Sequence, residues 1–105
     1  TDGAVVLAVS GEVDMLSAPR LAEAIHTALA PKPAALIVDL TKVEFLASAG
    51  LSVLVNGQAE VSPPTRFAVV ADGAATSRPI KLMGIDSLLS LHRTLDNALN
   101  WIAGA

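Results

Sequence analysis

The sequence predicts an α/β fold, with a mixed β-sheet of about four to five strands packed by about four helices. Short apolar runs of strand length alternate along the chain with segments whose apolar residues recur at helical spacing. The composition is 52% hydrophobic and only 16% charged, which is typical of strands buried on both faces. A chain of 105 residues suits one modest core, so we expect residues 1–105 to form a single domain.

The first half of the chain contains two predicted strands and one predicted helix. The run 4–9 and the run 35–40 are apolar and have the length of strands. Ser17 precedes Ala18-Pro19, as an N-cap residue precedes a proline in the first turn of a helix. Residues of one helical face follow it, namely Leu21, Ile25, Ala28 and Leu29.

Asp2-Gly3 is a strong hairpin-turn dipeptide at the start of this sequence. The usual partner strand of such a turn would precede residue 1. A first edge strand before residue 1 and a merely flexible start both remain open.

In the second half of the chain, predicted helices and strands continue to alternate. A helix is predicted from Ser48 until Ser62-Pro63-Pro64, and the run 66–71 is a third strand. A short helix, regular from about Ser77, is expected to end at Gly84. A brief strand within 87–92 precedes a terminal amphipathic helix, whose apolar residues are Leu95, Ala98, Leu99 and Ile102.

Charge and composition exclude several classes of function. The net charge is −3, the seven cations are dispersed and only three residues are aromatic, so we expect no direct nucleic-acid partner. No run approaches the roughly 18 apolar residues that would cross a membrane. Cysteine is absent and no secretory pattern opens the sequence, so we expect a cytoplasmic protein.

Cofactor and metal sites are also not predicted. Two isolated histidines, His26 and His92, do not form a ligand set, and no residues repeat at zinc or calcium spacing. No glycine-rich phosphate loop occurs. We expect neither a metal nor a cofactor.

Ser48 is the leading candidate for a regulated residue. It stands where a buried strand passes through a short loop, containing Thr41, Lys42 and Glu44, into a helix. An N-cap serine turns its oxygen toward the unpaired N–H groups of the first turn. The partial positive charge there also favours an added phosphate.

Three segments in this order resemble the STAS domain of bacterial anti-sigma-factor antagonists. They are Gly11-Glu12-Val13-Asp14, Val38-Asp39-Leu40 and Phe45-Leu46-Ala47-Ser48-Ala49-Gly50-Leu51, and the segment Leu82-Met83-Gly84-Ile85 is similar to the family's end-of-helix pattern. The resemblance covers nearly the whole chain. It implies a STAS-like fold.

The resemblance also implies a site and a mechanism. The family's loop usually reads Asp-Ser-Ser-Gly, and its phosphorylated serine aligns with Ser48, whereas this chain has Ala47-Ser48-Ala49-Gly50. Asp14 is implied to lie near that loop on the partner-binding face, with Ala47, Ala49 and Gly50 allowing close approach.

Partner switching is the function that this family implies. The unmodified domain binds an anti-sigma factor with a serine-kinase-type ATP fold and so frees a sigma factor, phosphorylation ends the interaction, and a serine phosphatase restores it. The alternative within the family is an interaction module of a stress-signalling scaffold or of a transporter complex.

A small serine hydrolase is the rival from a different class, because a strand-serine-helix arrangement also positions hydrolase nucleophiles. That motif requires Gly-x-Ser-x-Gly, whereas Leu46 replaces its first glycine here. We therefore expect a non-enzymatic protein.

Overall fold

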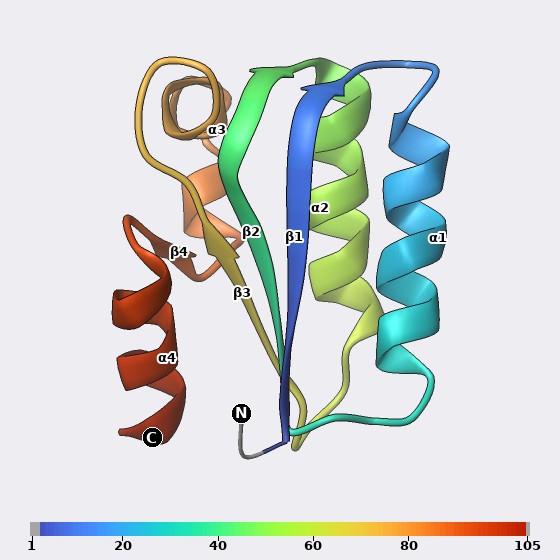
Figure 1. The fold of residues 1–105 in the computed structure, drawn as a ribbon, viewed down its shortest axis with the longest axis vertical. Helices are drawn as coiled ribbons and strands as arrows, with labels where there is room; N and C mark the ends of the chain where they lie inside the picture. The colour runs from blue at the N-terminus through green and yellow to red at the C-terminus, as the bar shows by residue number, and fades with distance from the viewer. Residues whose placement is uncertain (1–2, 105) are drawn as a thin grey trace.

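The computed structural model describes residues 3–104 and contains one sheet with helices on both faces (Figure 1). The elements follow in the order β1 (Ala4–Val13), α1 (Ala18–Leu29), β2 (Ala35–Leu46), α2 (Ser48–Glu60), β3 (Arg66–Val70), α3 (Ser77–Leu82), a 3₁₀ turn (Ile85–Ser87), β4 (Leu91–His92) and α4 (Leu95–Ala103). The expected α/β fold, with four strands and four helices, is confirmed.

The sheet has the strand order β1-β2-β3-β4, and all its pairings among residues 3–104 are parallel. We expected a mixed sheet. The described strands are parallel because each connection between neighbours crosses over through a helix, as parallel pairing requires. The alternative of a strand before residue 1, which the sequence left open, lies outside the described residues.

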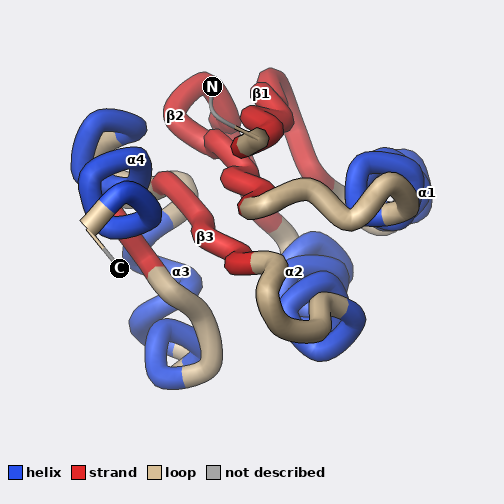
Figure 2. The backbone as a smooth tube through the Cα atoms, turned by 90° about the horizontal axis from the view of Figure 1, so that it is seen from below, coloured by secondary structure: helices blue, strands red, loops and turns tan. Residues whose placement is uncertain are grey.

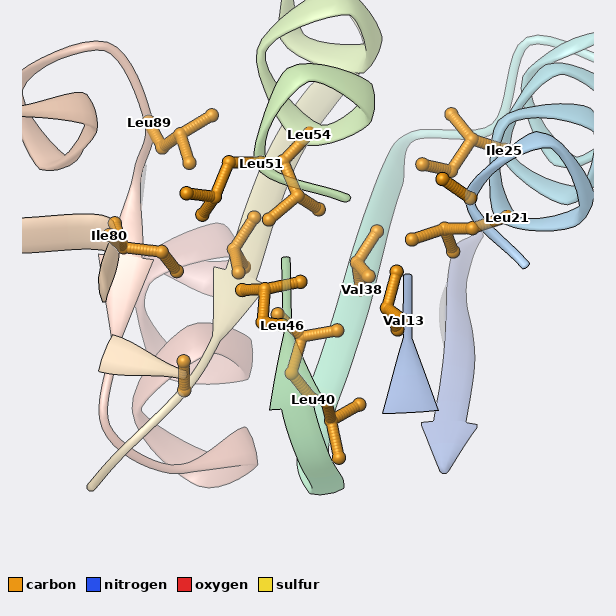
Figure 3. Packing of buried hydrophobic residues seen from close by; sticks show 14 of the residues in the cluster. Val13, Leu21, Ile25, Val38, Leu40, Leu46, Leu51, Leu54, Ile80 and Leu89 are labelled. Atoms are coloured by element: carbon orange, nitrogen blue, oxygen red, sulfur yellow. The ribbon is translucent and has the colours of Figure 1, made fainter. Parts of the chain in front are cut away.

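Two clusters of buried side chains divide the helices between the two faces of the sheet. The larger cluster joins α1, α2 and α3 to one face, and its members include Leu21, Ile25, Val38, Leu51, Leu54 and Ile80 (Figure 3). The smaller cluster holds α4 against the other face through Ala98, Ile37, Ala68 and Val70. Figure 2 shows α4 on the side of the strands opposite α1 and α2.

The predicted elements match closely, except that β1 and β2 continue further than expected. Residues 41–46 were expected to be loop but belong to β2, where Ser10 pairs with Lys42 and Val13 pairs with Leu46. Val43 and Leu46 are buried while Lys42 and Glu44 are exposed, so the segment has one face toward the core and one toward solvent. β1 and β2 therefore extend as a two-stranded ribbon beyond the five-residue β3.

Helix α4 is fixed at both ends of its contact with the sheet. The Thr94 hydroxyl caps its start by accepting a 3.0 Å hydrogen bond from the Asn97 N–H. Further along, the Trp101 ring lies 4.9 Å from the guanidinium carbon of Arg66 and 5.2 Å from the His92 ring. Residues from β3, β4 and α4 thus meet around one indole.

Within residues 3–104, no helix has the length and apolar character needed to cross a membrane.

Candidate partner-binding site

The carboxyl ends of β1 and β2 meet the beginning of α2 at one edge of the sheet (Figure 1). The backbone N–H of Ala47 donates a 2.8 Å hydrogen bond to the carbonyl oxygen of Val13. This bond joins the residue before Ser48 to the residue before Asp14. The structure therefore brings together the two segments that the sequence singled out.

Ser48 is exposed and is the first residue of α2. We expected it at the N-cap, and that placement is wrong: Ala47 occupies the N-cap in an extended conformation (φ −83°, ψ 170°). The Ala47 carbonyl accepts hydrogen bonds from the Gly50 and Leu51 N–H groups. Because the methyl group of Ala47 cannot cap, the N–H groups of Ser48 and Ala49 have no partner within the helix.

The Ser48 hydroxyl forms no hydrogen bond with any residue between 3 and 104. It is neither part of the core nor engaged in capping. An exposed hydroxyl beside the positive end of a thirteen-residue helix is accessible to another protein and compatible with an added anion.

Gly50 lies on the inner side of the same turn and is buried. A Cβ atom at this position would lie 2.6 Å from Cγ1 of Val13 and 2.7 Å from Cδ1 of Leu46. The missing side chain thus lets α2 approach the ends of β1 and β2. Gly50 was expected to allow a partner protein to approach closely, but it allows the close approach of α2 to its own sheet. Ala47 and Ala49 are partly exposed beside Ser48.

Asp14 organises the loop between β1 and α1. Its Oδ1 accepts 3.0 Å hydrogen bonds from the N–H groups of Leu16 and Ser17, and its carbonyl accepts a 2.8 Å bond from the Ala18 N–H. Hydrogen bonds from Ser17, with a smaller one from Leu16, lower the pKa of the Asp14 carboxyl below its ordinary value. Asp14 is therefore a charged, fixed side chain at this edge.

Ser17 precedes α1 as expected, but its side chain does not cap the helix. Its Oγ accepts a 2.9 Å hydrogen bond from the Asp14 N–H and lies 2.9 Å from the Glu12 carbonyl oxygen. The first-turn N–H of Arg20, which a capping side chain would accept, donates instead to the carbonyl oxygen of Ser17 at 3.0 Å. The side chains of Asp14 and Ser17 hold the loop together.

Three large apolar side chains at this edge were missed by the sequence reasoning. Met15 and Leu16 are 78% and 86% exposed in the loop that follows β1, and Phe45 is 52% exposed near the end of β2. Phe45 pairs with Glu12 across the ribbon. The sequence feature that could have identified Met15 and Leu16 is their position. They are two consecutive apolar residues that lie before the helix beginning at Ala18.

The described residues contain no group of three or more histidine, aspartate and glutamate side chains that could hold a metal ion. Nδ1 of His26 lies 2.6 Å from a carboxylate oxygen of Glu60, and His92 packs against Trp101. Neither histidine hydrogen-bonds to Ser48. The site offers an exposed hydroxyl, helix N–H groups, a fixed carboxylate and apolar side chains, which together suit contact with a protein.

The chain belongs to the STAS-domain family: the family profile described as "Mlab, STAS domain" matches residues 1–91.

Several named relatives share nearly all of this chain. It is 43% identical to the anti-sigma-F factor antagonist RsfB of Mycobacterium tuberculosis over 98% of its own length and 84% of that protein. A crystal structure of an anti-sigma factor antagonist from Mycobacterium paratuberculosis superposes with a TM-score of 0.94 at 47% identity, covering 98% of this chain and 88% of that one.

The fold extends to more distant proteins. The unphosphorylated form of the anti-sigma factor antagonist SpoIIAA has a TM-score of 0.77 at 18% identity, covering 100% of this chain and 92% of that one. At this identity the likeness shows the fold alone. The resemblance deduced from the sequence motifs is confirmed at the level of the family.

Proposed function

We propose that this chain is an anti-sigma factor antagonist that binds its anti-sigma factor through the edge containing Ser48 and Asp14. The observation that carries the proposal is the exposed, unbonded hydroxyl of Ser48 at the start of α2, in a chain whose relatives at 43% and 47% identity are named anti-sigma factor antagonists. The unmodified domain binds the anti-sigma factor and thereby releases a sigma factor.

Phosphorylation of Ser48 is the proposed off-switch. A phosphoserine carries about −1.5 to −2 charges at neutral pH, which the positive end of α2 accommodates without unfolding the domain. The cost falls on the complex, because a dianion in an interface made for a neutral hydroxyl must be desolvated without a partner. A loss of about 4 kcal/mol weakens binding roughly a thousandfold.

The proposed partners follow from this switch. The anti-sigma factor has a serine-kinase-type ATP fold and supplies the phosphoryl group, and a serine phosphatase removes it. This STAS domain acts in the bacterial cytoplasm and is not itself an enzyme. A serine nucleophile needs an adjacent base, and Ser48 forms no hydrogen bond with either histidine. This geometry supports a non-enzymatic role for Ser48.

Binding measurements on three proteins test the proposal. Wild type and Ser48→Ala are expected to bind the anti-sigma-F factor of Mycobacterium tuberculosis with similar affinity, because both are uncharged at residue 48. Ser48→Glu adds a carboxylate at this residue and is expected to bind more weakly. Ser52→Glu, on the exposed face of the same helix one turn later, controls for the change in net charge. Equal affinities of Ser48→Ala and Ser48→Glu for the anti-sigma factor would contradict the proposal that a negative charge at residue 48 ends binding.

A further inference from the structure

We infer that Met15 and Leu16 form an apolar anchor by which this chain selects its anti-sigma factor, which presents a complementary apolar pocket beside the surface that meets Ser48. This inference rests on the proposed function and names a contact within it. The two side chains are the most exposed large apolar residues among those that the structure describes, at 78% and 86%. Their position and their fixed backbone both point to a partner.

The loop that carries the anchor is held in one conformation. Asp14 accepts hydrogen bonds from the N–H groups of Leu16 and Ser17, and Ser17 in turn accepts one from the Asp14 N–H. Met15 and Leu16 are therefore presented by a bonded backbone although their side chains contact solvent. Binding through a pre-organised loop loses little backbone entropy, which favours affinity.

The anchor is continuous with the proposed switch. The hydrogen bond between the Ala47 N–H and the Val13 carbonyl places the end of β1 beside the start of α2. Only Asp14 separates Val13 from the anchor. A protein that covers Ser48 is thus positioned to cover Met15 and Leu16 as well.

The chemistry of the two side chains indicates what the partner must offer. Neither can form a strong hydrogen bond, so they add affinity only where they leave water for an apolar pocket. Protein interfaces concentrate most of their binding energy in a few well-buried side chains, and methionine is enriched among interface residues. Ser48 would then control whether the partner binds, while Met15 and Leu16 control which partner binds.

The test measures binding kinetics of the full chain with the anti-sigma-F factor of Mycobacterium tuberculosis. Met15→Ser/Leu16→Ser is expected to raise Kd about a hundredfold, mainly through faster dissociation, because apolar contacts act after the encounter. Met15→Leu/Leu16→Met keeps the apolar surface and is expected to stay within about threefold of wild type. All variants are checked for unchanged Tm, which is expected for side chains this exposed.

A matched control lies at the end of α3. Leu82, the last residue of that helix, and Met83, which follows it, are 74% and 64% exposed. Leu82→Ser/Met83→Ser removes comparable apolar surface and is expected to leave Kd nearly unchanged. An equal loss of affinity in both double serine variants would show a general effect of exposed apolar surface. It would contradict the inference that Met15 and Leu16 anchor the partner.

The outcomes separate the inference from the function on which it rests. If wild type binds, Ser48→Glu does not, and the Met15/Leu16 double serine variant binds like wild type, the anchor is wrong and the proposed function stands. If wild type does not bind, both are wrong. Sedimentation of the wild-type chain without a partner adds one more outcome. If wild type forms a dimer, the Met15→Ser/Leu16→Ser variant is a monomer, and both bind the anti-sigma factor equally well, then Met15 and Leu16 serve self-association. That result would contradict the inference.

Discussion

Gly50 and Val13 approach so closely that a Cβ atom on the glycine would lie 2.6 Å from Cγ1 of the valine. This contact sets the position of α2 against β1, and with it the position of Ser48 two residues earlier. Leu46 closes the same space from β2, at 2.7 Å. The packing beneath the site thus depends on a residue without a side chain.

Gly50→Ala is expected to destabilise the fold. Alanine is favoured over glycine in a helix by about 1 kcal/mol. Overpacking commonly costs about 1–3 kcal/mol, and here Val13 is a stiff β-branched neighbour. Because this Cβ atom would lie 2.6 Å from Val13 and 2.7 Å from Leu46, we expect an overpacking cost in the upper part of that range, about 2–3 kcal/mol. The net loss in the free energy of unfolding, measured by urea denaturation, is then about 1–2 kcal/mol.

Ser52→Ala, on the exposed face of the same helix, controls for the change in helix propensity and is expected to stay within about 0.5 kcal/mol of wild type. A Gly50→Ala variant as stable as wild type would show that α2 moves outward at little cost.

Asp14→Asn is expected to change how stability depends on pH. Hydrogen bonding in the folded chain lowers the pKa of this carboxyl from its ordinary value of 3.8. Its contribution is therefore present above about pH 3.8 and is lost as pH falls through the lower folded pKa. The difference in unfolding free energy between wild type and Asp14→Asn should be largest near neutral pH and shrink below pH 3.8.

The control for Asp14 is Glu23→Gln on the exposed face of α1, which removes a carboxylate that has no hydrogen bond to residues 3–104. A difference between wild type and Asp14→Asn that is constant from pH 2 to pH 6, or that grows in acid, would contradict the linkage.

Arg66 and Trp101 are expected to stabilise the docking of α4 jointly. The guanidinium lies 4.9 Å from the ring centroid, and its Nη1 is buried without a hydrogen-bond partner in the described part of the chain. A double-mutant cycle with Arg66→Met and Trp101→Leu should give a coupling of about 0.5–2 kcal/mol, as for a partly desolvated cation–π pair.

Arg78→Met, on exposed α3, replaces Arg66→Met in the control cycle and is expected to show no coupling to Trp101. A coupling of zero for Arg66 and Trp101 as well would mean that α4 docks through the Ala98 cluster alone.

The fold was predictable because local patterns and global packing agree along most of this chain. Leu21 and Ile25 mark the buried face of α1, and the apolar run after Pro33 begins the central strand. The extension of β2 to Leu46 was not predictable, because Thr41, Lys42 and Glu44 have the composition of a loop. The pairing of Lys42, Val43, Phe45 and Leu46 with β1 is what makes this segment a strand.

Two residues of the proposed site could be predicted from the sequence, but their detailed geometry could not. Ser48 and Asp14 were found from their motifs, and the structure places their segments side by side. The shift of Ser48 from the N-cap to the first helical residue follows from the extended conformation of Ala47, on which local sequence has little influence. Met15 and Leu16 were missed because exposure depends on the tertiary fold, and their types alone predict burial.

Intact mass measurement with site mapping tests the central claim most directly. Wild type and Ser48→Ala are each incubated with ATP and the anti-sigma-F factor of Mycobacterium tuberculosis, as the proposed kinase. The account predicts that wild type gains about 80 Da, the mass of one phosphoryl group, located on Ser48, and that Ser48→Ala gains nothing. Phosphate on another residue, or a wild-type chain that gains no mass, would contradict the account.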